Sequence, residues 1–331
     1  MMKVVAFGRT ETLFSSIIEL ASSGNKIELI ITSESTQYQY EKDINDFKNL
    51  AKELNSKFIV TKNLLDSEIK NLILALKPDI AISVNWPTLV PSTFIDFFPS
   101  GILNAHAGDL PRFKGNAVRN WALLSGEKRM ALTLHLMDAD LDSGPILIKE
   151  YCEISNTTKI GDLYNFVQER TPKLFSKALK GIGNGQLHPK SQPTDANSVL
   201  RCYPRLPCDS HIDWRLPASD IDRLVRASSE PFNGAFTYLV GEKFIIWRSR
   251  VFVPEFDYLS SPGQVVDRDT LQDTISVATG SGFLVIEECE SSSFGRTKPI
   301  EVVKTLRTRF GLLLDEELTS LRKELEKYKN L

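Results

Sequence analysis

The chain has 331 residues, 42% of them hydrophobic and 25% charged, with a formal net charge of −2. This length suffices for two domains with substantial cores, and the composition is that of an ordinary globular protein. The near-neutral charge provides no global basic field. We therefore expect no nucleic-acid partner, although the net charge does not report a local basic patch.

No apolar run reaches the length of a membrane span, so no membrane partner is expected. The N-terminal sequence MMKVVAFGRTETLF has an apolar run too short for a signal peptide and is typical of a first strand. The four cysteines lack metal-ligand spacing, which favours reduced thiols, a cytoplasmic protein and no bound metal.

Strand and helix patterns alternate over the first 185 residues. Apolar periodicity predicts strands at 3–7, 27–31, 57–60, 80–84, 130–137 and 146–154, and helices at 12–22, 43–54, 67–76 and 159–180. Strands separated by helices predict an α/β fold with a doubly wound, mostly parallel sheet. Gly8 follows the first strand, but without a GxGxxG pattern there is no dinucleotide-binding fingerprint.

Proline recurs in residues 186–210 with little periodicity. This predicts a linker between a catalytic domain at 1–185 and a second domain at 211–331. In the second domain, a helix at 218–228 and short strands at 235–239, 244–253, 263–267, 275–278 and 283–288 predict a smaller OB-like β-barrel. Basic residues such as Arg226 alternate there with acidic ones such as Asp222, which predicts a solvated surface of mixed charge. A charged terminal helix at 315–331 is expected to pack on the body of the protein through its leucines.

Asn104 and His106 lie at the end of an apolar run, where a buried strand leaves the sheet. Side chains two residues apart on a strand share a face, and open α/β sheets bind ligands beyond the carboxyl ends of their strands. Asp142 follows in the segment Leu141-Asp142-Ser143-Gly144-Pro145. Separately, the histidine also fits a turn cap and the aspartate a turn former. Together, an oxyanion donor, a proton carrier and a carboxylate are what acyl transfer to an amine requires.

Residues 101–150 closely resemble the formyltetrahydrofolate-dependent formyltransferases, which include methionyl-tRNA, glycinamide ribonucleotide and nucleotide-sugar enzymes. The family's Leu-Pro-x-Tyr/Phe-x-Gly loop matches residues 110–115, and its Asp-x-Gly-Pro-Ile turn matches residues 142–146. One departure is Ala131, which stands where the family often has glycine. Residues 213–251 resemble the C-terminal domain shared by methionyl-tRNA formyltransferase and some sugar formyltransferases, so the resemblance covers most of residues 3–290.

The resemblance implies N10-formyltetrahydrofolate as the formyl donor and a direct transfer that needs neither a metal nor a covalent intermediate. It implies that Asn104 stabilises the oxyanion, that His106 moves a proton or supports the oxyanion, and that Asp142 orients His106 and accepts the amine proton. The residues expected to contact the folate are Trp86, Leu89, Val90, Leu141 and Asp142.

The loops favour a nucleotide-diphosphate-linked amino-deoxy sugar as the acceptor, for example a 4-amino-4,6-dideoxyhexose used in lipopolysaccharide O-antigen synthesis. Residues 115–122 (GNAVRNWA) look more like the sugar enzymes than the Gly-Ala-Ala-Pro-Ile sequence of the tRNA enzymes, and residues 9–11 (RTE) replace their Thr-Pro-x-Phe. The basic insertion loop of the tRNA enzymes is also missing. The residues predicted to bind this substrate, with the cations on its phosphates, are Arg9, Arg112, Lys114, Asn116 and Asn120.

Methionyl-tRNA formyltransferase is the alternative function, and it predicts that substrate binding depends strongly on salt. A non-catalytic regulator that binds folate or a nucleotide is disfavoured by the complete Asn/His/Asp set. A hydrolase would release formate with no amine present. A homodimer is compatible with every one of these functions.

Overall fold

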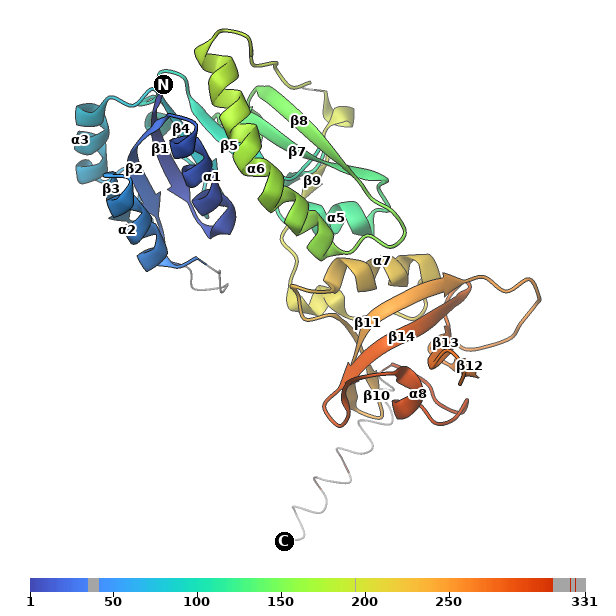
Figure 1. The fold of residues 1–331 in the computed structure, drawn as a ribbon. Coiled ribbons are helices and arrows are strands. Elements are labelled where there is room, and N and C mark those ends of the chain that lie inside the picture. Colours follow the sequence, from blue (N-terminus) through green and yellow to red (C-terminus); the bar gives the residue numbers. More distant parts are fainter. Residues whose placement is uncertain (35–41, 194, 312–321, 323–324, 326–331) are drawn as a thin grey trace. The chain divides into compact units, whose positions relative to one another are not determined.

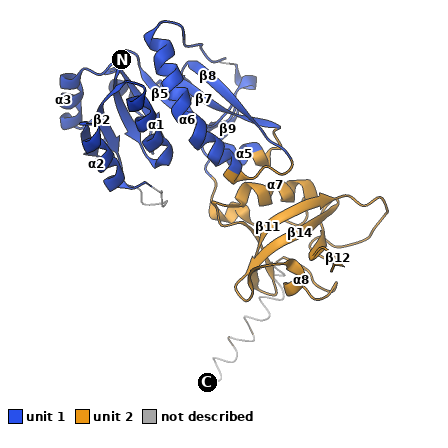
Figure 2. Cartoon of the chain, in the orientation of Figure 1, with its two compact units in different colours: residues 1–122, 128–155, 162–204 blue, residues 123–127, 156–161, 205–331 orange. Residues whose placement is uncertain are grey.

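The structure is a computed structural model that describes residues 1–34, 42–193, 195–311, 322 and 325 (Figure 1). The chain divides into two compact units, coloured blue and orange in Figure 2. The N-terminal unit comprises residues 1–122, 128–155 and 162–204, and the C-terminal unit comprises residues 123–127, 156–161 and 205–331. Within the described part of the chain, no helix has both the length and the apolar character that crossing a bilayer requires.

A seven-stranded sheet with the order β3-β2-β1-β4-β5-β7-β8 forms the centre of the N-terminal unit. The first five strands in this order are mutually parallel, whereas β7 and β8 are antiparallel to their neighbours. The predicted α/β fold with a mostly parallel sheet is confirmed. The strands are β1 (Lys3–Gly8), β2 (Lys26–Thr32), β3 (Lys57–Val60), β4 (Ile80–Val84), β5 (Ile102–His106), β7 (Arg129–Leu136) and β8 (Ile146–Glu153).

In the described part of the chain six helices accompany this sheet, and the start of α2 is marked by a capping signal in the sequence. Asp43 illustrates this, because its carboxylate accepts the backbone N–H groups of Asn45 and Asp46 while Asp46 caps Asp43 in return. The helices α4 and α5 were not predicted, because segments this short do not display helical periodicity. The helices are α1 (Thr10–Ser22), α2 (Ile44–Glu53), α3 (Ser67–Leu76), α4 (Ser92–Ile95), α5 (Val118–Leu124) and α6 (Ile160–Gly183).

Strands β1 and β4 are apolar apart from Lys3 and Ser83, because both faces of a parallel sheet are covered. Residues 4–7 of β1 and 80–82 of β4 are fully buried. Phe7 contacts the rings of Trp86 and Phe94 edge to face, with centroids 5.6 and 5.7 Å apart. These contacts anchor the segment that follows β4 to the core, so it leaves the sheet in a defined direction.

The segment expected to be a linker pairs with the sheet and loops of the N-terminal unit. Lys190 bridges Ile146 at the start of β8, and β9 (Arg201–Cys202) pairs in parallel with β6 (Lys114–Gly115). The Trp121 indole N–H donates to the carbonyl of Tyr203 over 2.8 Å. Two short 3-10 helices, η1 (Ala196–Ser198) and η2 (Pro207–Ser210), complete the segment.

The C-terminal unit is a smaller antiparallel β domain, as predicted. Its sheet has the order β10-β11-β14-β13-β12, with β15 paired to β14, and α7 packs on β11 and β14. Buried Trp214, Ile221, Phe244 and Leu284 belong to its core. The elements are α7 (Ala218–Ser228), β10 (Ala235–Leu239), β11 (Glu242–Phe252), β12 (Val265–Asp269), β13 (Thr274–Ala278), β14 (Phe283–Ser291), β15 (Gly295–Thr297) and α8 (Pro299–Val302).

The pair Asp222 and Arg226 was assigned to a solvated surface, but both side chains are about nine-tenths buried and form an ion pair of 2.9 Å. The prediction was wrong because α7 turns the face that carries these two side chains toward β11. There the Ser249 hydroxyl donates to Asp222. The predicted terminal helix at 315–331 lies almost wholly outside the described residues.

Candidate active site

Strand β5 brings Asn104 and His106 to one face of the sheet, as their spacing predicts. The antiparallel neighbour β7 places His135 opposite Asn104 and Thr133 opposite His106. All four side chains are buried, with exposed fractions of 9% or less. Four polar side chains in the middle of an apolar sheet are costly unless they bond to one another or to a ligand.

The orientation of the His106 ring is set by the loop that follows β5. Its Nε2 lies 2.6 Å from the carbonyl oxygen of Phe113. Since a carbonyl only accepts, Nε2 carries a proton, and Nδ1 is the ring atom left for proton transfer. Nδ1 faces Asp142, with 3.5 Å to Oδ2.

Glycine is required at position 108 for this arrangement. A Cβ there would lie 2.3 Å from the Phe113 carbonyl oxygen and 2.6 Å from His106 Nε2. The loop is further held by Thr133, whose hydroxyl donates to the carbonyl of Gly108, and by Lys149, whose ammonium contacts Asp109 over 2.6 Å. The Gly/Pro-rich loop therefore acts as a rigid support for His106.

Asp142 lies in the turn after β7 with a left-handed backbone, φ +49°. The backbone N–H of Gly115 donates to its Oδ2 over 2.8 Å. Gln192 holds the turn from outside, because its side-chain amide donates to the carbonyls of Asp142 and Gly144 over 2.9 and 2.7 Å. The structure thus brings Asn104, His106 and Asp142 into one cluster.

The sequence reasoning missed His135, which sits at the centre of this cluster. Its Nε2 lies 3.1 Å from Asn104 Nδ2 and 3.7 Å from Asp142 Oδ1, and its Nδ1 lies 2.8 Å from the carbonyl of Leu136. The pKa of His135 is lowered from 6.5 to about 4, chiefly by burial and also by the nearby His106, against the opposing effect of Asp142. The sequence contains a pattern that could have identified His135. Thr133 and His135 repeat on β7 the polar i, i+2 spacing of Asn104 and His106.

The residues predicted to bind the acceptor come from the loops around this cluster. Arg9 follows β1 and its Nε donates to the carbonyl of Asn85 over 3.4 Å. Arg112 and Asn116 are exposed, Lys114 is half-buried in β6, and Asn120 is 4% exposed on α5. Arg112, Lys114 and Asn116 therefore lie in one loop, whereas Arg9 comes from the end of a separate strand.

The residues predicted to bind folate lie in two segments. In the parallel pair of β4 and β5, Ser83 aligns with Asn104, so the segment from Trp86 to Val90 leaves the sheet beside the cluster. Within it, Trp86 is half-buried, Leu89 is exposed and Val90 is buried. Leu141, half-buried, directly precedes Asp142.

Two buried polar atoms around the Asn104 cluster have unused hydrogen-bonding capacity. The Ser83 hydroxyl and Gln192 Oε1 are buried without a hydrogen-bond partner among the described residues. One is aligned with Asn104 and the other belongs to the side chain that holds the Asp142 turn. Unpaired buried polar atoms around the Asn104 cluster, together with the half-buried aromatic Trp86 in the segment after β4, fit a flat, polar ring system such as a pterin.

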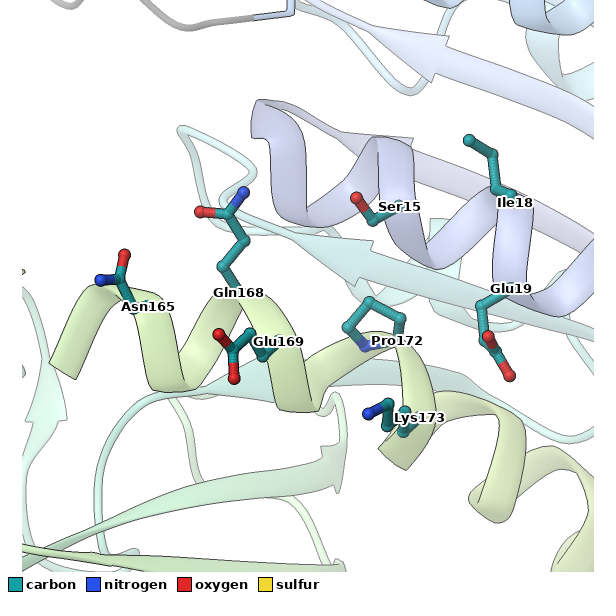
Figure 3. A pocket seen from close by; sticks show the side chains of 8 residues that line it. All are labelled: Ser15, Ile18, Glu19, Asn165, Gln168, Glu169, Pro172 and Lys173. Carbon is teal, nitrogen blue, oxygen red and sulfur yellow. The ribbon is translucent and has the colours of Figure 1, made fainter. Parts of the chain in front are cut away.

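A separate groove lies between α1 and α6 (Figure 3). Figure 3 shows that side chains of both helices line it, including Pro172 from the middle of α6. It contains none of the predicted site residues and is distinct from the Asn104 cluster. Its lining residues are Ser15, Ile18, Glu19, Asn165, Gln168, Glu169, Pro172 and Lys173.

The comparison with known proteins agrees with the two units. A family model described as formyl transferase matches residues 2–179, more than half of the chain, and one described as formyl transferase, C-terminal domain, matches residues 206–303. This chain belongs to the formyltransferase family. It is an enzyme of formyl transfer, as its sequence motifs predict.

Its relatives match both units. The methionyl-tRNA formyltransferase of Alkaliphilus oremlandii is 29% identical over 294 residues, which cover 88% of this chain and 92% of that protein. That of Clostridium perfringens is 34% identical over 225 residues, which cover 67% and 69%. The solved N-formyltransferase of Helicobacter canadensis, in complex with folinic acid and dTDP-3-aminofucose, shares the fold with a TM-score of 0.61 at 17% identity, over 86% of this chain and 98% of that one.

Two predictions are overturned by these relatives: that the acceptor is a nucleotide-linked amino sugar and that nucleic acid is not a partner. Methionyl-tRNA formyltransferases share 27–34% identity with this chain, well above the 17% of the Helicobacter enzyme. The sugar prediction rested on residues 9–11, on residues 115–122 and on the missing basic insertion loop, and loops vary more among relatives than the elements they connect. A net charge of −2 sums over the whole surface and does not report local patches.

Proposed function

We propose that this protein transfers the formyl group of N10-formyltetrahydrofolate to the amine of methionyl-tRNA. The observation that carries the proposal is that relatives of this function match both units over most of their length. In this proposal residues 1–185 perform the reaction and residues 211–331 contribute to binding the tRNA. Residues 186–210 connect these two domains.

Bound N10-formyltetrahydrofolate supplies the formyl group, and the residues we expect to hold it are Trp86, Leu89, Val90, Leu141 and Asp142. Asn104 donates a side-chain N–H to the formyl oxygen as that oxygen gains negative charge. His106 moves a proton through Nδ1, because its Nε2–H is already donated to the Phe113 carbonyl. Asp142 orients the ring of His106. It also accepts the proton that the amine releases, directly or through water.

The distances support these roles. Asp142 lies within 3.5 Å of His106, close enough to tighten into a hydrogen bond when substrate binds, since catalytic contacts are often long in free enzymes. The backbone N–H of Gly115 donates to the same carboxylate over 2.8 Å and fixes its position.

We propose that Arg9, Arg112, Lys114 and Asn116 face the acceptor end of the tRNA, whereas Asn120, which is 4% exposed, does not. Arginine and lysine side chains pair with phosphate oxygens and position a nucleic acid without reading its sequence. Exposed Arg112, with its guanidinium 5.6 Å from the ring of Phe113, is the most accessible of these cations.

The test is formyl transfer to methionyl-tRNA, with uncharged tRNA, free methionine and water as parallel acceptors. We expect turnover only with methionyl-tRNA, and a KM for the tRNA that rises steeply with salt because phosphate contacts release counterions. Formate release without an amine would indicate a hydrolase. No turnover with methionyl-tRNA would refute the proposal, and equal rates with free methionine would refute the tRNA as the recognised partner.

A further inference from the structure

His135 makes three polar contacts from within the core of the sheet. The Leu136 carbonyl lies at its Nδ1, and both Asn104 Nδ2 and Asp142 Oδ1 lie at its Nε2. Its exposed fraction is 2%, so bulk water does not satisfy the ring. The proposed reaction uses Asn104, His106 and Asp142 and leaves this histidine without a role.

The contacts determine which nitrogen carries the proton. A backbone carbonyl only accepts hydrogen bonds, so Nδ1, at 2.8 Å from the Leu136 carbonyl, must be the N–H atom. In the neutral ring Nε2 is then a lone pair, and at 3.1 Å it requires a donor from Asn104. This settles the orientation of the Asn104 amide, because the reverse orientation would set an oxygen lone pair against a nitrogen lone pair.

We propose that neutral His135 is a positioning residue that orients Asn104 as a hydrogen-bond donor. One N–H of the amide is used by His135, and the second N–H of the same nitrogen remains for the formyl oxygen. This inference rests on the proposed function, since it assigns the freed N–H to the oxyanion of formyl transfer. It adds to the reaction a residue that does not touch the reacting atoms.

The charged neighbours explain why the neutral form matters. His106 on β5 and Asp142 in the turn after β7 face the ring, and Asp138 lies in the same turn. A protonated His135 would donate Nε2–H to Asp142, drawing that carboxylate away from His106, and would reverse the Asn104 amide. The two histidines therefore hold opposite tautomers, with Nε2–H on His106 and Nδ1–H on His135.

The first test compares His135→Phe, which removes the acceptor but keeps a flat ring, with His135→Gln, whose side-chain oxygen restores an acceptor. We expect His135→Phe to lower kcat by about a hundredfold, the effect of losing one oxyanion donor, with KM for both substrates changed by less than about threefold. His135→Gln should stay within about tenfold of the native rate. Exposed His188→Phe is the matched control and should retain native kinetics.

A double-substitution cycle tests the route through Asn104. In an Asn104→Ala background, His135→Phe should lower kcat by less than about threefold further, because residues acting through one contact are not additive. Additive losses, or equal losses in His135→Phe and His135→Gln, would overturn the proposal.

The last test does not depend on turnover and uses ¹⁵N spectra of the ring nitrogens of the native protein. The chain has only four histidines, so variants assign the signals. We expect a protonated Nδ1 and an unprotonated Nε2 for His135 at neutral pH, and a proton on Nε2 would overturn the inference. If the native protein failed to formylate methionyl-tRNA while the spectra showed this tautomer, the proposed function would fail and the hydrogen-bond assignment would stand.

Discussion

Two buried aspartates, Asp142 in the N-terminal unit and Asp222 in the C-terminal unit, have opposite surroundings. Asp222 accepts from Arg226 over 2.9 Å and from Ser249 over 2.8 Å, and Arg226 also donates to the carbonyl of Thr158. Asp142 receives one backbone N–H within hydrogen-bond distance and faces two histidines at 3.5 and 3.7 Å. Its backbone is also in the left-handed region, which is unfavourable for a residue other than glycine.

The difference separates a structural network from a reactive one. The Asp222 carboxylate is occupied by an arginine and a hydroxyl, and it holds α7 against β11. A carboxylate with one firm donor and two distant imidazoles has capacity left for a substrate proton. Substitutions in the first network should therefore change stability, and those in the second should change rate.

The largest effect is expected from Asp222→Ala, which leaves the Arg226 guanidinium buried without its partner. Loss of one partner of a buried ion pair costs about 3–5 kcal/mol in free energy of unfolding. Urea denaturation measures it, and the turnover per folded molecule should be unchanged. Asp220→Ala is the control, because its ion pair with Arg223 is partly exposed and should contribute less than about 1 kcal/mol. Equal effects of the two variants would contradict the distinction.

Asn104→Ala and Asp142→Asn should each lower kcat by about a hundredfold or more, equivalent to about 3–4 kcal/mol of transition-state stabilisation. Steady-state kinetics with methionyl-tRNA measures the loss, and circular dichroism checks that the fold is intact. Asp140→Asn, an exposed change in the same turn, serves as the control and should be neutral. A near-native rate in either variant would remove that residue from the mechanism.

His135 should make stability depend on pH. Its pKa of about 4 in the folded protein lies below 6.5, so the unfolded chain binds the proton first as pH falls. The part of the free energy of unfolding that depends on neutral His135 is fully present above pH 6.5 and is lost as pH falls toward 4. This part amounts to about 3 kcal/mol.

Thermal unfolding across this pH range should show a steeper loss in the native protein than in His135→Gln. Ionisation of the carboxylates affects both proteins alike, so the difference isolates the imidazole. His188→Gln should follow the native curve. Parallel curves for the native protein and His135→Gln would show that the ring is not buried in neutral form.

The smallest effect is expected from Gln192→Ala, which removes the two hydrogen bonds to the turn of Asp142 and Gly144. A turn held less firmly should lower kcat by about tenfold, or about 1.4 kcal/mol. Gln186→Ala is the control, because that glutamine is exposed and its side chain bonds only to Asn184 among the described residues. A native rate for Gln192→Ala would mean that the segment after α6 does not support the site.

Local patterns were sufficient for much of this molecule. Alternating apolar periods predicted the strands and long helices of the N-terminal sheet, because hydrophobic burial has a different period in each element. The spacing of Asn104 and His106 placed them on one face of β5, because side chains alternate along a strand. The family followed from motifs that sit in the rigid loop and turn around these residues.

Only the tertiary structure decided the partners of these residues. His135 joins the cluster because β7 runs antiparallel to β5, and nothing local in the sequence states which strands pair or in which register. Gln192 reaches the Asp142 turn from a segment whose prolines suggested a linker, and Asp222 is buried because α7 packs on β11. Contacts between residues distant in the chain depend on how elements pack, whereas the hydrophobic period of a single element is determined by that element's own residues.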